Sequence, residues 1–163
     1  MFTGIIESTG TIASLTRNAF GVRLLIDPGN FSYQPTHGDS IAVNGVCLTH
    51  SPRDADPPGH FAFDVIQETL NVTSLGALAV GSQVNLEASL RADTPIAGHF
   101  VQGHVDAMGS VVDVYDGADE WRTTIEVDPA LMKYIVPKGS IAIDGVSLTI
   151  ASVDKAANRF SVA

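Results

Sequence analysis

Apolar and polar residues alternate in short runs along this chain, and Gly, Pro, Asn or Asp residues separate the runs. A period of two residues is typical of β-strands that bury one face. Helical periodicity is confined to two short segments, around Thr73–Ala79 and Pro129–Tyr134. We expect Asp128 to cap the second of these, with Pro129 at its first helical position. The pattern therefore predicts an all-β protein with little helix.

One ten-residue stretch occurs twice. SIAVNGVCLT at Ser40–Thr49 returns as SIAIDGVSLT at Ser140–Thr149, with seven of the ten positions identical and Cys47 replaced by Ser147. Further matches at an offset of 99 extend the repeat on both sides. Self-similarity at this period indicates a duplicated domain, since the repeats of a solenoid are much shorter. The two copies are residues 1–64 and 100–163.

Each copy contains a predicted hairpin. Asn44-Gly45 and Asp144-Gly145 are typical of type I′ turns, in which both central residues have positive φ. After the first turn, Val46 and Leu48 are expected on one face of a strand, with Cys47 and Thr49 on the other. Together with turn signals every 8–12 residues, these hairpins favour a small antiparallel barrel or sandwich in each half.

The second copy ends at Ala163, where the counterpart of residues 64–91 would begin. We expect a truncated second barrel with unpaired strand edges; a naturally shortened domain is the alternative.

Composition excludes several classes of function. The net charge is −9, and Lys and Arg residues form no cluster that would follow a phosphate backbone or an anionic membrane. Cys47 is the only cysteine, so no intrachain disulfide is possible, which favours a reducing cytoplasm. We also expect no signal peptide and no membrane-spanning segment.

Motifs for cofactors and metals are weak. The chain has neither GxxxxGK[ST] nor GxGxxG, so no nucleotide phosphate site is indicated. Gln102–Asp106 is interpreted as a strand with His104 and Asp106 on one face, but two such ligands do not make a metal site. His104 is either a hydrogen-bonded strand histidine or a functional group, and Cys47 is either a buried small side chain or a reactive one.

Six motifs in order resemble riboflavin synthase of the alpha-chain type, from Met1 to about Val162: MFTGI, NGVCLT, DVIQETL, VNLEASLR, GHFVQGHVD and KGSIAIDGVSLT. The resemblance implies two tandem six-stranded antiparallel Greek-key β-barrels. The expected N-terminal barrel is 1–96. The expected C-terminal barrel, 97–163, lacks both the counterpart of 64–91 and a C-terminal helix.

The same resemblance implies a reaction. Two molecules of 6,7-dimethyl-8-ribityllumazine are converted into riboflavin and 5-amino-6-ribitylaminouracil by transfer of a four-carbon unit, without a cofactor or metal. It also implies a cytoplasmic homotrimer when the chain is full length, with each active site between barrels of two subunits. An association with lumazine synthase is left open.

Site residues follow from the resemblance motif by motif. Those implied in catalysis are Phe2, Cys47, His104, Ser147 and Thr149, with His104 as the candidate for proton transfer. Those implied in substrate binding are Gly4, Ile5, Ile6, Ser40, Cys47, Leu48, Thr49, Asp64, Val65, Ile66, Gln67, Glu68, Thr69, Gly103, His104, Val105, Lys138, Ser147, Leu148 and Thr149. In this interpretation Glu68 and Thr69 reach the ribityl chain, and Gly103–Val105 begin the second pocket.

The Cys47/Ser147 difference suggests why the repeat is imperfect. Two identical substrates call for two similar pockets, but donor and acceptor need different roles. Two other functions remain open. A non-catalytic lumazine or flavin antenna protein would keep one pocket and degrade the other. A duplicated β-barrel that serves only as an interaction module would bind no small molecule.

Overall fold

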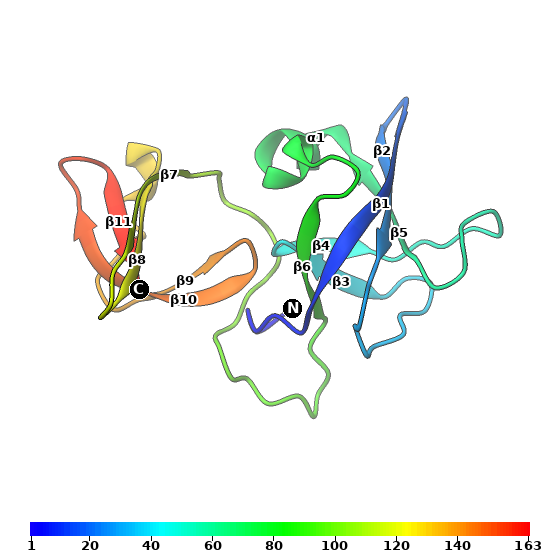
Figure 1. The fold of residues 1–163 in the computed structure, drawn as a ribbon, viewed down its shortest axis with the longest axis horizontal. Helices are drawn as coiled ribbons and strands as arrows, with labels where there is room; N and C mark the ends of the chain where they lie inside the picture. The colour runs from blue at the N-terminus through cyan, green and yellow to red at the C-terminus, as the bar shows by residue number, and fades with distance from the viewer. The chain divides into compact units, whose positions relative to one another are not determined.

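The computed structural model describes all residues from Met1 to Ala163 and divides the chain into two compact units (Figure 1). The first unit comprises Met1–Asp106 together with the turn Ala142–Val146. The second comprises Ala107–Ile141 and Ser147–Ala163. Nearly all regular structure is antiparallel β-sheet, which confirms the predicted all-β fold.

The first unit contains a six-stranded sheet in the order β4-β3-β6-β1-β2-β5. Its two edge strands, β4 and β5, meet at an isolated antiparallel bridge between His50 and Phe63. A long connection places β6 between β3 and β1, so the last strand of the unit holds the first and third together. The strands are β1 Ser8–Asn18, β2 Gly21–Asp27, β3 Ser40–Val43, β4 Val46–Thr49, β5 Phe61–Ile66 and β6 Gln83–Ala88.

The second unit carries most of a five-stranded sheet in the order β7-β8-β11-β10-β9. Its irregularities repeat those of the first. The β1–β2 register shifts between Ile12 and Ser14, and the β7–β8 register shifts between Val111 and Asp113, each 99 residues later. The duplication seen in the sequence is therefore also a duplication of backbone geometry. The strands are β7 Ser110–Asp116, β8 Trp121–Glu126, β9 Ser140–Ile143, β10 Val146–Asp154 and β11 Arg159–Val162.

Both predicted hairpin turns are confirmed. Asn44 and Gly45 have φ values of 46° and 75°, and Asp144 and Gly145 have values of 45° and 84°. Two residues with positive φ give the turn the twist that matches the flanking strands. After the first turn, Val46 and Leu48 are buried while Thr49 is exposed, as the alternation predicts.

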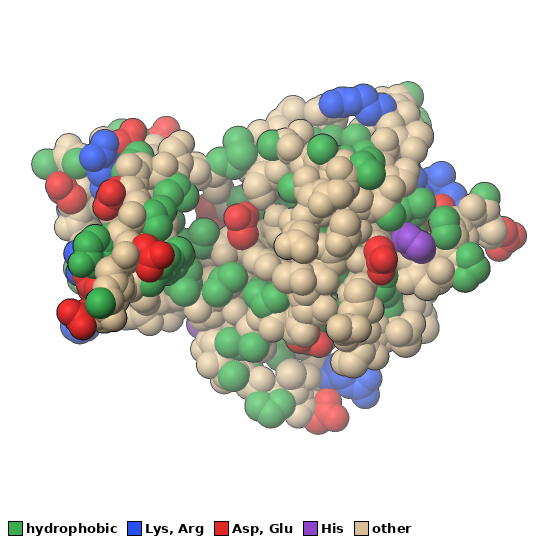
Figure 2. Space-filling model, viewed as in Figure 1, with side chains coloured by type: hydrophobic (Ala, Val, Ile, Leu, Met, Phe, Trp, Pro, Cys, Tyr) green, Lys and Arg blue, Asp and Glu red, His purple; other side chains and the backbone are tan.

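No strand of the second sheet corresponds to β6. In the first unit β6 pairs with both β1 and β3, whereas β7 and β9 are the two free edges of the second sheet. Every residue of β7 is exposed, including Val111, Val114 and Tyr115. Hydrophobic side chains accordingly lie at the surface of this part of the molecule (Figure 2). This exposure follows from the missing neighbour, since an edge strand lacks cover on one side.

Helical structure is short. The predicted helix near Thr73–Ala79 is a 3₁₀ turn, η1 Ser74–Ala77. The preceding helix α1, Gln67–Val72, was not predicted as such. The third element, η2 Pro129–Leu131, has Asp128 accepting a hydrogen bond from the Ala130 amide at 2.8 Å, so the predicted cap is confirmed although the helix is shorter than expected. No helix is long and apolar enough to cross a membrane.

The hydrophobic core is concentrated in the first unit. Apolar side chains from all six strands and from Phe31 and Leu75 form one cluster, in which Phe31 and Phe61 meet edge to face at 5.6 Å. The second unit buries fewer large apolar side chains: Ile125, Met132, Ile135, Ile150, Phe160 and Val162.

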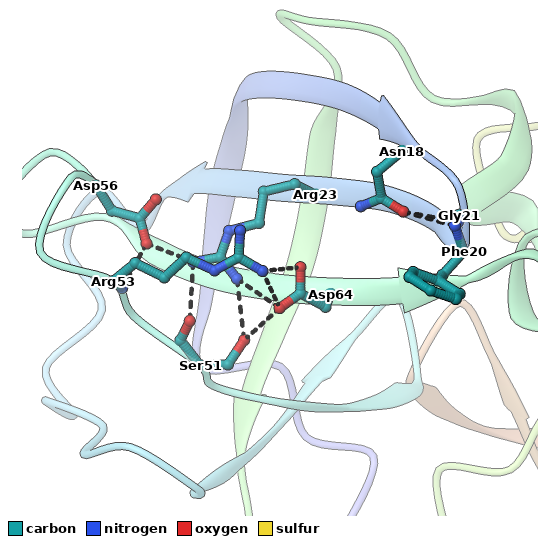
Figure 3. A network of polar contacts seen from close by, with 8 residues as sticks. All are labelled: Asn18, Phe20, Gly21, Arg23, Ser51, Arg53, Asp56 and Asp64. Atoms are coloured by element: carbon teal, nitrogen blue, oxygen red, sulfur yellow. Dashed lines mark hydrogen bonds and ion pairs between the residues drawn. The ribbon is translucent and has the colours of Figure 1, made fainter.

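An ion-pair network joins β2 to β5 and to the loop after β4 (Figure 3). The Arg23 guanidinium is nearly buried and pairs with Asp56 and, at 2.9 Å, with Asp64. It also donates to the hydroxyl and carbonyl oxygens of Ser51. Arg53 pairs with the same Asp64 carboxylate at 2.9 Å. A buried guanidinium needs such partners, because a lone charge in the interior is costly.

The pKa of Asp56 is lowered in the folded protein. Desolvation raises this pKa, but the hydrogen bond from the Arg53 backbone amide and the pairing with Arg23 outweigh it, so the pKa of Asp56 lies below its usual 3.8. The carboxylate is therefore bound more tightly in its ionised form in the folded protein. By linkage, the stabilisation is complete above pH 3.8 and is lost as the pH falls through the lowered folded pKa.

We predict that Asp56→Asn destabilises the protein by about 2 kcal/mol at pH 7, because it leaves Arg23 partly unpaired in the interior. The difference from wild type should shrink as the pH falls below 3.8 and through the lowered folded pKa of Asp56, where the wild-type carboxylate also becomes neutral. Urea unfolding at pH 7 and pH 3 measures both values. Asp54→Asn, an exposed position in the same loop, serves as the control and should be neutral. An Asp56→Asn penalty that does not change with pH would contradict the linkage.

Candidate functional site

A cavity of about 160 Å³ lies at the start of β4 in the first unit. One wall is the α1 region and another is the segment that follows Val101. Six of its nine lining residues are among those predicted from the sequence. The lining residues are Val46, Cys47, Glu68, Thr69, Val72, Thr73, Gly103, His104 and Val105.

Backbone hydrogen bonds bring the start of the second copy to this cavity. The amide of Phe2 donates to the Val101 carbonyl at 2.7 Å, and the Val101 amide donates back at 3.0 Å. The Cys47 amide donates to the Gly103 carbonyl at 2.8 Å. The first compact unit thus extends to Asp106, beyond the predicted boundary at residue 96, because residues 99–103 are bonded to it.

The predicted strand Gln102–Asp106 is wrong. This segment belongs to no strand, and the residue before it, Val101, forms only an isolated bridge with Phe2. Its exposure still alternates, since Gly103 is buried while Gln102 and His104 are exposed. The alternation arises from packing against Cys47 and Phe2 rather than from a sheet ladder.

Gly103 lies in close contact with Cys47 of β4 and with Phe2 of the N-terminal segment. A side-chain carbon at this residue would lie 2.6 Å from Cys47 Cβ and 2.8 Å from Phe2 Cε2. Its φ is +82°, a backbone conformation that residues other than glycine rarely adopt. Phe2 is fully buried and packs with Ala42, Val101 and Cys47. Phe2 therefore forms the floor behind Cys47 and does not line the cavity itself.

The cavity wall has an apolar part and a polar part. Val46, Val72 and Val105 provide apolar surface. Glu68 and Thr69, at the start of α1, provide a carboxylate and a hydroxyl group. Such a division suits a ligand with a flat ring and a hydroxylated chain, because each part can meet matching chemistry.

Three cavity residues were missed in the sequence: Val46, Val72 and Thr73. Val46 was expected on the same strand face as Leu48, and it is buried as well as lining the cavity. Thr73 is buried, and its hydroxyl group donates to the Thr69 carbonyl at 2.6 Å, closing the end of α1. Only the helix brings Val72 and Thr73 to the cavity, and the helix had no recognisable signal in the sequence.

Several predicted binding residues lie away from this cavity. Asp64 is on the outer face of β5, where its carboxylate pairs with Arg23 and Arg53 (Figure 3). Its neighbour Val65 is buried in the core, as is Leu48 of β4. The others that do not line the cavity are Gly4, Ile5, Ile6, Ser40, Thr49, Ile66 and Gln67.

The remaining predicted residues belong to the second unit: Lys138, Ser147, Leu148 and Thr149. Lys138 has a positive φ of 64°, and its amide donates to the Ile150 carbonyl at 2.8 Å. In the first unit Gly38 makes the equivalent bond to His50, also at 2.8 Å. The local frame around the repeated hairpin is thus the same in both copies.

A second and larger cleft, about 270 Å³, lies beside the loop from Pro52 to His60. It contains none of the predicted site residues. We place the candidate site in the smaller cavity, because Cys47, Glu68 and His104 converge there from three separate segments. No group of three or more His, Cys, Asp or Glu side chains is arranged to hold a metal ion.

Comparisons with known proteins give one consistent family. The lumazine binding domain family matches residues 3–89 and 102–163. The riboflavin synthase of Mycobacterium tuberculosis is 44% identical over 154 residues, which are 94% of this chain and 75% of that protein. The riboflavin synthase of Bacillus subtilis is 43% identical over 92% of this chain and 68% of that protein. The solved structure of LumP complexed with 6,7-dimethyl-8-(1′-D-ribityl) lumazine is 26% identical, with a TM-score of 0.81 over 99% of this chain and 84% of that chain.

We predict that Gly103→Ala destabilises the first unit more than Gly59→Ala does. Both glycines have a φ of +82°, but Gly59 has no atom within 4 Å of an added carbon. The control should therefore show only the backbone penalty, about 1 kcal/mol. Gly103→Ala should cost a further 1–3 kcal/mol or so, because Cys47 and Phe2 must move. Chemical unfolding of both variants measures the difference, and equal penalties would contradict the close approach.

Proposed function

Because the chain belongs to the riboflavin synthase family, we propose that it converts two molecules of 6,7-dimethyl-8-ribityllumazine into riboflavin and 5-amino-6-ribitylaminouracil. In this proposal it is a transferase of a four-carbon unit. The observation that carries it is the composition of the cavity. Cys47 comes from the first copy, whereas Gly103 and His104 come from the start of the second, and the two backbones are hydrogen-bonded.

The cavity has the chemistry that this substrate requires. The lumazine ring would lie against the valine side chains, and the neutral ribityl chain would reach Glu68 and Thr69. Hydroxyl groups are bound well by carboxylate and hydroxyl partners, and no phosphate cradle is needed. This matches the absence of a glycine-rich phosphate motif in the sequence.

The reaction needs proton transfer and no external oxidant, since the two products together contain the atoms of two substrates. A proton must leave the C7 methyl group of one lumazine. We assign this transfer to His104, which lines the cavity and whose imidazole is the side chain suited to it near neutral pH. Cys47, on β4, would contact the ring of the bound substrate.

The second copy of the repeat supplies a second, similar set of side chains. We propose that Ser147 and Thr149 stabilise developing charge or hold a water molecule at the second substrate, with Lys138 nearby in the same repeat. Holding two substrates in a reactive orientation lowers the barrier by up to about 7–11 kcal/mol. By resemblance to the family, these groups would meet in a cytoplasmic homotrimer.

A non-catalytic binding protein is the second candidate, and the structural likeness to LumP favours it. That likeness concerns the fold, which both functions share. The residues favour the enzyme, because the chain retains the hairpin motif in both copies together with Cys47, His104, Ser147 and Thr149.

We predict that the purified chain forms riboflavin from 6,7-dimethyl-8-ribityllumazine with no added cofactor. One riboflavin should appear for every two lumazines consumed, because one substrate gives up its four-carbon unit to the other. Absorbance and fluorescence follow both compounds. Tight binding without riboflavin would instead support the antenna function, and absence of lumazine binding would support an interaction module.

We predict that Cys47→Ser lowers the turnover rate by about tenfold or more while lumazine binding changes little, because it removes a difference between the two copies. The matched variant Cys47→Ser/Ser147→Cys restores that difference in the opposite order and should recover part of the lost activity. Turnover and binding of each variant are measured at the same pH. Full activity of Cys47→Ser alone would contradict the role of this asymmetry.

A further inference from the structure

We propose that Glu87 is a positioning residue, whose buried carboxylate fixes the N-terminal segment and through it the wall of the cavity. The catalytic part of this inference rests on the proposed function, whereas its structural part does not. Glu87 lies in the VNLEASLR motif, but no role was predicted for it from the sequence.

The position of Glu87 on β6 is unusual. Val84 and Leu86 face the core, so Glu87 lies on the opposite face of the strand with Gln83 and Asn85. Those two neighbours are exposed or half-buried, but Glu87 is only 3% exposed. A carboxylate removed from water to this extent is costly unless donors surround it.

Three donors of the N-terminal segment surround this carboxylate. Oε1 accepts hydrogen bonds from the Thr3 amide at 2.5 Å and from the Thr3 hydroxyl group at 2.6 Å. Oε2 accepts one from the Gly4 amide at 3.0 Å. None of the salt bridges in the structure involves Glu87. Its charge is therefore compensated by the segment that it holds.

The held segment leads directly to the site. Thr3 follows Phe2, which pairs with Val101 and packs against Cys47. The Thr3 carbonyl also accepts a hydrogen bond from the His99 amide at 3.0 Å. Chain termini are usually poorly ordered unless they are tied down. Here backbone hydrogen bonds hold Met1 and Phe2, with the Leu90 amide donating to the Met1 carbonyl at 2.8 Å. Glu87 adds the buried side-chain contact to Thr3 and Gly4, and we infer that it helps to set where Phe2 stands relative to Gly103.

The carboxylate is better suited to this task than an amide. A Gln at position 87 would keep the shape but would turn an N–H₂ group toward an N–H or O–H donor, because only one of its two ends accepts hydrogen bonds. Glu7 offers a natural comparison: it also accepts a backbone amide, that of Ala88 at 2.9 Å, but it is exposed. Its loss should leave the segment in place.

Amide hydrogen exchange and steady-state kinetics of Glu87→Gln test the proposal. Well below the unfolding temperature, exchange at Thr3, Gly4 and Val101 should be about tenfold faster or more, because charge-assisted hydrogen bonds are lost. Exchange in β2 and β5 should be unchanged. The turnover rate should fall by a similar factor, and Glu7→Gln should match wild type in every measurement.

Substitutions at Thr3 keep the test decisive if Glu87→Gln folds poorly. Thr3→Val removes the hydroxyl donor and should speed exchange of Gly4, while Thr3→Ser retains the donor and should restore wild-type exchange and turnover. A Glu87→Gln protein that is less stable overall but exchanges and reacts normally when folded would show a purely structural role and overturn the proposal. A wild-type chain without activity would refute the proposed function, and the exchange results would still decide the role of Glu87.

Discussion

The antiparallel bridge between Phe2 and Val101 is the contact on which the candidate site depends. These two residues are equivalent positions of the two copies, 99 residues apart. By pairing with Phe2, the start of the second copy enters the first unit, and Gly103 reaches the Cys47 amide. The close approach requires a residue without a side chain at position 103, and it requires an ordered N-terminus. The glycine, the buried Phe2 and the Glu87 carboxylate are thus parts of one arrangement.

Local features of this fold were predictable because their causes are local. Asn44-Gly45 and Asp144-Gly145 adopt positive φ at both positions because few other pairs can, and Asp128 caps the turn that follows it. The chemistry of the cavity was partly predictable for a different reason, since Cys47 and Glu68 lie in motifs that resemble the family. Contacts over long separations left no such signal. Glu87 resembles any polar residue on an outer strand face until the N-terminal segment covers it, and Asp64 resembles a pocket residue until Arg23 is found beside it.

The two sheets show what β6 contributes. In the first unit it bonds to both β1 and β3, buries Val84 and Leu86, and presents Glu87 to the N-terminal segment. The second sheet has the equivalents of the other five strands with the same bulge, yet its β7 is exposed throughout. Strand geometry therefore survives without this strand, because turns and register shifts are set locally. The burial of β7 does not survive, because it depends on the neighbouring strand.

Fold similarity alone cannot separate an enzyme of this family from a binding protein, because LumP and the riboflavin synthases both resemble this chain. The distinction has to come from the side chains at equivalent positions of the repeat. A binding protein needs only one such set of polar groups, whereas a reaction between two identical molecules calls for two similar sets that can take different roles. The hairpin motif satisfies both conditions: its backbone and seven of ten residues are shared, and a thiol in one copy stands where the other has a hydroxyl group. That combination of likeness and difference supports the proposed reaction of one substrate with itself.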